Sequence, residues 1–118
     1  NIDAAQAQSK IADILLSQER EEVAIEIEAA RTELQRSRSV FAAQQQNANE
    51  ANEAFRLASL RYTRGLSTAL DVSDAQVALM TARTNEARSI YDLYLAIADL
   101  ARAQGRPVAV PNFQSNTR

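Results

Sequence analysis

Carboxylates are the only residues of this 118-residue sequence whose types and spacing could do chemistry. Asp71 and Asp74 lie three positions apart, so in a helix they would share one face. Other acidic pairs, such as Glu21 with Glu22, alternate with apolar or basic residues in the way that helix surfaces normally do. Histidine and cysteine are both absent, which removes the commonest general base and the commonest metal ligands.

No spacing in the chain matches a catalytic or cofactor-binding motif. A di-metal helical bundle would need Glu-x-x-His repeats, and these cannot occur without histidine. Glycine-rich phosphate loops, nucleophile elbows and zinc-ligand spacings are also missing from the sequence. We therefore predict that the chain is not an enzyme and has no catalytic residues, no metal site and no cofactor.

The composition favours long helices and excludes some partners. Hydrophobic residues make up 46% of the chain and aromatic residues only 5%, with two glycines and two prolines, which suits closely packed helices. A net charge of −2 provides no concentrated basic surface, so we expect no nucleic acid partner. The chain begins at Asn1 without a signal sequence, and we expect it to be a mature fragment or an excised piece of a longer protein.

Two long helices must position the carboxylates, and the lone interior glycine marks the turn between them. We predict a helix over 3–64, a tip at 65–67 and a second helix over 68–104, with a polar, extended tail at 106–118. Asp3 can cap the first helix, and Thr68 with Asp71 reads as a capping box for the second. Gly105 and the following proline predict the stop. The fold class is therefore all-α, a long antiparallel helical hairpin.

The apolar residues of the first helix follow the spacing of a coiled coil, with one residue in every seven. The series is Ile27, Leu34, Phe41, Ala48, Phe55 and Tyr62. A flanking series contains Val23, Ala30, Ala51 and Ala58 and is interrupted by Ser37 and Gln44. Ile25 and Ile27 point in nearly opposite directions, since two residues turn a helix by about 200°. The first helix therefore needs more neighbours than one.

The second helix is predicted to carry two adjacent seams. One contains Leu70, Val77, Tyr91 and Ala98, and the other contains Met80, Ala87, Tyr94 and Ala101. Leu79, Leu93 and Leu100 add apolar surface elsewhere. Because the second helix is much shorter, it covers the first only down to about residue 27 when the chain folds back at Gly65. Residues 3–26 are expected to project beyond the hairpin.

The tip and the second helix resemble the TolC-type outer membrane efflux proteins. The resemblance rests on Ala54-Phe55-Arg56-Leu57-Ala58, Arg61-Tyr62, Gly65, Ser67, Asp71-Val72, Asp74-Ala75-Gln76 and the alanine-rich run that ends Leu100-Ala101-Arg102-Ala103-Gln104-Gly105. It implies a homotrimer in the outer membrane whose helices form a periplasmic α-barrel, with this segment as the hairpin of the second, C-terminal repeat. It also implies a periplasmic adaptor protein as partner, and an inner membrane transporter indirectly.

The same resemblance assigns roles at the tip. Tyr62, Gly65, Leu66 and Ser67 match the adaptor-docking surface, and Asp71 and Asp74 match an acidic ring at the channel entrance, where carboxylates attract cations. Helix capping alone could equally explain Asp71, and packing in the seam could equally explain Tyr62. Some family members carry a basic residue where this chain has Ser67, so an ion-pair latch at that position is not expected.

Two other classes of protein fit a long helical hairpin. The hairpin of a periplasmic adaptor is also a coiled coil, although its tip lacks the Asp-Val-x-Asp-Ala-Gln start of the second helix. A structural coiled coil with no role in transport would form a stable, self-contained dimer or tetramer. In both cases the tip carboxylates would have no role in a channel.

Overall fold

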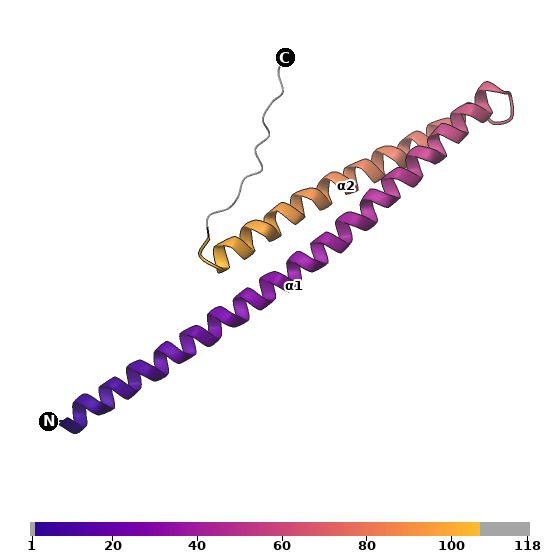
Figure 1. The fold of residues 1–118 in the computed structure, drawn as a ribbon. Coiled ribbons are helices and arrows are strands. Elements are labelled where there is room, and N and C mark those ends of the chain that lie inside the picture. Colours follow the sequence, from indigo (N-terminus) through magenta and orange to yellow (C-terminus); the bar gives the residue numbers. More distant parts are fainter. Residues whose placement is uncertain (1, 107–118) are drawn as a thin grey trace, which may run out of the picture.

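Two long helices packed side by side in opposite directions make up the fold. In the computed structural model, which describes residues 2–106, α1 spans Ile2–Thr63 and α2 spans Ala69–Ala103. The helices contain 62 and 35 residues, and Figure 1 shows α2 folding back along part of α1. The predicted all-α antiparallel hairpin is confirmed. Apart from Arg106, the tail predicted at 106–118 lies outside the described residues.

Backbone hydrogen bonds explain why α1 ends where it does. The backbone N–H of Leu66 donates to the carbonyl of Arg61 at 2.7 Å, and that of Gly65 to Tyr62 at 3.0 Å. This pair of bonds is the Schellman motif, which requires a left-handed residue just after the helix. Gly65 takes this role with φ of 73°. The glycine therefore fixes the turn through its backbone.

The start of α2 is fixed by side chains. Thr68 is the N-cap residue and forms a reciprocal capping box with Asp71, as predicted. At the other end Gly105, with φ of 68°, repeats the motif of Gly65, because Arg106 donates to Ala101 at 2.9 Å. Asp3 lies within the first turn of α1, because the helix already begins at Ile2. There the carboxylate faces the positive end of the helix dipole without being the cap.

The face of α1 that packs on α2 follows the predicted heptads, with one correction. The covered positions, which we call the inner seam of α1, are Ile27, Ala30, Leu34, Ser37, Phe41, Gln44, Ala48, Ala51, Phe55 and Ala58. Ser37 and Gln44 were predicted to interrupt this seam, yet Ser37 is only 2% exposed and Gln44 is half-buried. The seam continues through them because the heptad spacing, rather than the polarity of each side chain, decides which face meets the partner.

The face of α2 that packs on α1 consists of residues that neither predicted seam included. The inner seam of α2 consists of Val72, Ala75, Leu79, Ala82, Glu86, Ser89, Leu93, Ala96, Leu100 and Ala103. Leucines predicted to add surface elsewhere therefore belong to the contact. Small residues recur along this seam, and they let the two backbones approach closely while Phe and Leu side chains from α1 fill the space beside them. The large residues of the two predicted seams, such as Val77, Met80 and Tyr91, lie on the side of α2 that faces away from α1.

Beyond the end of α2, α1 continues alone. Every residue from 2 to 26 is exposed, as the predicted overhang requires (Figure 1). Large apolar side chains in this stretch are Ile2, Ile11, Ile14, Leu15, Leu16, Val23 and Ile25. No helix of the described residues is long and apolar enough to cross a membrane. The apolar side chains of this overhang are therefore not covered by any other described part of the chain.

Candidate functional site at the hairpin tip

The tip gathers exposed apolar side chains at the point where the chain turns. Leu66 is 74% exposed and Tyr62 is 52% exposed, and Leu70, at the start of α2, is 68% exposed. Tyr62 was predicted to continue the inner seam, but the seam ends at Ala58, because α2 begins only at Ala69 and its first seam residue is Val72. Tyr62 is therefore free to form part of an outward-facing surface.

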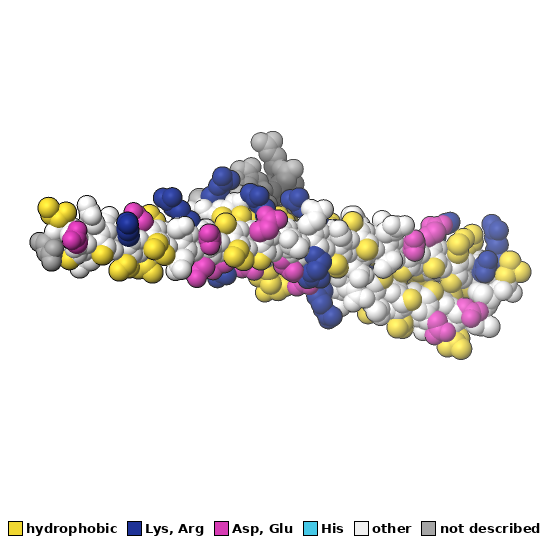
Figure 2. All heavy atoms as spheres, turned by 90° about the horizontal axis from the view of Figure 1, so that it is seen from below, with side chains coloured by type: hydrophobic (Ala, Val, Ile, Leu, Met, Phe, Trp, Pro, Cys, Tyr) yellow, Lys and Arg dark blue, Asp and Glu magenta, His cyan; other side chains and the backbone are white. Residues whose placement is uncertain are grey.

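Charged side chains surround this apolar surface. Arg61 lies in the last turn of α1, where a cation stabilises the negative end of the helix dipole, and Arg64 follows it in the turn. Neither arginine is in any of the ion pairs found among residues 2–106. Figure 2 shows basic, acidic and apolar side chains together at this end of the molecule. Such a mixed, exposed surface is suited to contact with another protein.

Ser67 has a different position from the other predicted tip residues. It is half-buried, and its hydroxyl donates to the backbone carbonyl of Ala58 at 3.4 Å. The bond connects the end of the turn to the last inner-seam residue of α1. Ser67 therefore orients the turn, whereas Leu66 beside it is the side chain that reaches outwards.

Asp71 is held in place by the N-cap of α2. The backbone N–H of Thr68 donates to Oδ2 of Asp71 at 3.1 Å, and the backbone N–H of Asp71 donates to the Thr68 hydroxyl at 3.3 Å. The hydrogen bond from the Thr68 backbone, with a smaller contribution from its side chain, lowers the pKa of Asp71 below its usual range. The capping role left open by the sequence is thus present, and it favours the ionised form of this exposed carboxylate.

Asp74 lies one turn further along α2 on the same face as Asp71. It is exposed and takes part in none of the side-chain hydrogen bonds or ion pairs found in the described part of the chain. The helical repeat puts both carboxylates on one flank of α2, with Asp71 about 60° and Asp74 about 120° from the centre of its inner seam. This leaves Asp74 available to bind cations or to face another chain.

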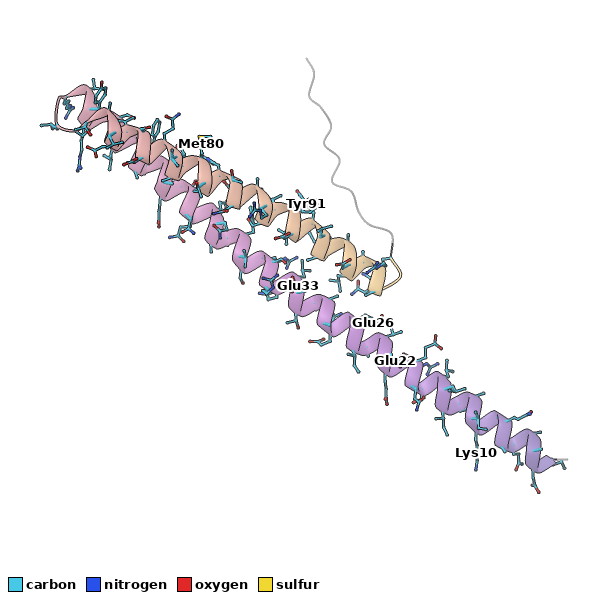
Figure 3. All side chains as sticks on the ribbon, turned by 180° about the vertical axis from the view of Figure 1, so that it is seen from behind. Lys10, Glu22, Glu26, Glu33, Met80 and Tyr91 are labelled. Atoms are coloured by element: carbon cyan, nitrogen blue, oxygen red, sulfur yellow. The ribbon has the colours of Figure 1, made fainter. Side chains whose placement is uncertain are left out.

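A second heptad pattern runs along the side of α2 opposite to α1. The residues of this outer seam are Leu70, Ser73, Val77, Met80, Thr84, Ala87, Tyr91, Tyr94, Ala98 and Ala101. Its large members are strongly exposed: Val77, Met80 and Tyr91 have 61%, 63% and 64% of their surface accessible. Met80 and Tyr91 are labelled on α2 in Figure 3. The outer seam contains both of the adjacent seams that the sequence predicted for this helix.

Elsewhere the described residues offer no site for chemistry. No group of three or more acidic side chains in residues 2–106 could hold a metal ion. A hollow lies where α2 ends beside α1, and it is lined mainly by small and charged residues, including Ala30, Glu33, Ala96 and Asp99. The tip and the outer seam are therefore the two surfaces that need an explanation.

Comparison with known families identifies the chain. Residues 1–106 match the family described as "Outer membrane efflux protein", so the chain belongs to this family. No curated protein and no solved structure gave a significant match. The family consists of non-enzymatic channel proteins of the outer membrane, which confirms both the resemblance and the expectation that the chain is not an enzyme. The chain is thus a helical segment of an efflux channel component.

Proposed function

We propose that this outer membrane efflux protein segment forms part of the wall of a trimeric, periplasmic α-barrel. In this proposal its tip docks a periplasmic adaptor protein, and its acidic residues line the channel entrance. The single observation that carries the proposal is the pair of seams on opposite faces of α2. A helix with heptads on both sides has a helical neighbour on each side. Helices joined in that way form a curved layer that can close into a barrel.

The overhang of α1 supports the same arrangement. Its exposed apolar residues lie on more than one side, with Leu16 and Val23 in line with the inner seam and Ile25 nearly opposite. Helices in proteins gain most of their stability from the packing of their apolar side chains, and no described residue covers these side chains of the overhang. In a barrel, neighbouring helices would cover them. The absence of such cover in the hairpin alone is expected for a part of a larger assembly.

The exposed surface at the tip supports docking. Leu66 and Tyr62 extend from a turn whose backbone is fixed by the Schellman motif and by Ser67. A rigid turn loses little conformational entropy when a partner binds. More of the free energy gained by burying its exposed apolar side chains therefore remains as binding affinity. The partner proposed for this surface is the periplasmic adaptor, with an inner membrane transporter joined indirectly.

The entrance ring is the proposed role of Asp71 and Asp74. In a trimer, two carboxylates from each of three copies would surround the opening, favouring cations over anions. The capping box favours the ionised form of Asp71, and Asp74 has no partner within the hairpin. The two other classes considered from the sequence, an adaptor hairpin and a structural coiled coil, are disfavoured because the chain belongs to the channel family.

Site-specific crosslinking tests the docking role. Since the chain has no cysteine, Leu66→Cys provides a single reactive thiol at the tip of the outer membrane protein that contains this segment. We expect a short thiol-to-amine crosslinker to join it to a periplasmic adaptor in intact cells. Gln45→Cys, exposed on α1 far from the tip, is the matched control and should give no such product. Adaptor products from both positions, or from neither, would contradict tip docking.

A further inference from the structure

The middle of the inner seam contains polar side chains where a coiled coil normally has apolar ones. Ser37 of α1 is 2% exposed, and its hydroxyl has no hydrogen-bond partner among the described residues. Ser89 of α2 is 4% exposed and satisfies its hydroxyl within its own helix, by donating to the carbonyl of Glu86 at 2.6 Å. Neither serine forms a side-chain hydrogen bond to the opposite helix. Burial of these groups therefore adds little to the attraction between the helices.

Glu86 and Gln44 extend this polar stretch. The side chain of Glu86 is only 16% exposed, and its ion-pair partner, Arg83 at 3.4 Å, belongs to the same helix. Gln44 is half-buried on α1. Since the helices run antiparallel from a short turn, seam positions pair in reverse order, and this order places Gln44 opposite Glu86. We call Ser37, Gln44, Glu86 and Ser89 the polar section.

The apolar stretches on the two sides of the polar section differ in size. Towards the tip, the large seam residues are Phe55, Val72 and Leu79, and the others are alanines. Towards the open end of the hairpin, beyond the polar section, the large seam residues are Ile27, Leu34, Leu93 and Leu100, while Phe41 lies within the polar section, between Ser37 and Gln44. Apolar burial scales with side-chain size, so the tip half is held together less strongly than the base half.

We propose that the polar section divides the hairpin into two units, and that the tip half opens while the base half stays closed. Cooperative opening spreads through contiguous packing, and an interruption of apolar contacts sets a boundary between units of different stability. The polar section lies between the two halves, so the tip half extends from Ala48 to Ala82, and the base half contains the seam residues up to Leu34 on α1 and from Leu93 on α2. This inference concerns the hairpin itself and holds whether or not the tip docks a partner.

Hydrogen exchange of the full 118-residue chain, followed peptide by peptide, tests the proposal. A helix separated from its partner is only marginally stable, so an opened half exchanges its amide hydrogens. We expect peptides from 48–58 and 72–82 to exchange about tenfold faster than those from 27–34 and 93–103, with a step at the polar section. A single rate for both halves, or a smooth gradient from the tip without a step, would overturn the proposal.

A pair of double variants identifies the cause of the step. Gln44→Leu with Glu86→Leu replaces the polar layer by an apolar one, and we expect the difference between the halves to fall to about twofold or less. Gln45→Leu with Glu50→Leu makes the same exchanges of residue type at exposed positions, and it should keep the tenfold difference. If the seam variant keeps the step, or the surface variant removes it, the polar section is not the boundary.

Discussion

The inner and outer faces of α2 both follow a heptad pattern, yet their side chains differ in size and in exposure. The inner face alternates alanine or serine with larger residues such as Leu79 and Leu93, and α1 covers it. The outer face presents Val77, Met80 and Tyr91 to solvent. Small residues permit close approach within the hairpin, whereas a free row of large residues needs a partner from outside it. Apolar periodicity thus marks a face that can pack against a helix without showing which helix that is.

Adding volume to the inner face should have the largest effect. Ala48 is 0% exposed, so Ala48→Leu would force the helices apart and cost up to about 3 kcal/mol of the free energy of unfolding. Ala87→Leu makes the same change on the exposed outer face and should leave stability almost unchanged. Urea unfolding followed by circular dichroism measures both. Equal losses at the two positions would remove the distinction between the faces.

Removing volume compares the faces a second time, at two positions in one turn of α2. Leu93 is half-buried on the inner seam, and Leu93→Ala should cost about 2 kcal/mol, the low end of the range for buried leucine. Tyr91 is 64% exposed, and Tyr91→Ala should cost only a small fraction of that in the isolated chain. A larger loss for Tyr91 in the same urea measurement would mean that the outer seam is already covered.

The N-cap of α2 should have a smaller, local effect on stability. Thr68→Ala removes the hydroxyl that accepts the backbone N–H of Asp71, and caps of this kind contribute about 1 kcal/mol. Thr68→Ser keeps an accepting hydroxyl and is the matched control. In thermal unfolding, the melting temperature of Thr68→Ser should be close to that of the parent chain, and that of Thr68→Ala should be lower. An alanine variant as stable as the parent would show that the capping box does not hold the tip.

The dependence of stability on pH should show the smallest effect. Because the folded chain lowers the pKa of Asp71, its stabilising effect is complete above the ordinary carboxyl pKa of about 4 and is lost as pH falls through the folded pKa. The melting temperature of the parent chain should therefore fall more steeply with acid than that of Asp71→Asn. Other carboxylates titrate equally in both chains, so the difference isolates Asp71. Parallel curves would contradict the capping contribution.

The sequence was sufficient to predict the elements of the hairpin but not the contacts between them. Gly65, Thr68 and Asp71 act through the local backbone, so their spacing alone predicted the turn and the cap. Which face of α2 packs on α1 was not predicted, because both faces carry apolar residues at heptad spacing and many of the residues at the contact are small. Ser37 and Gln44 interrupt the apolar series in the sequence, yet they lie in the inner seam of α1 because the heptad spacing places them there.

The most direct test of the central claim is the accessibility of the outer seam in the assembled protein. A single cysteine at Val77 can be labelled with a maleimide, both in the isolated chain and in outer membranes that contain the whole protein, with Gln45→Cys as the exposed reference. We expect the Val77 position to label readily in the isolated chain and to be protected in the membrane, while the reference labels in both. Equal labelling of both positions in the membrane would contradict a second helical neighbour on α2, and with it the barrel.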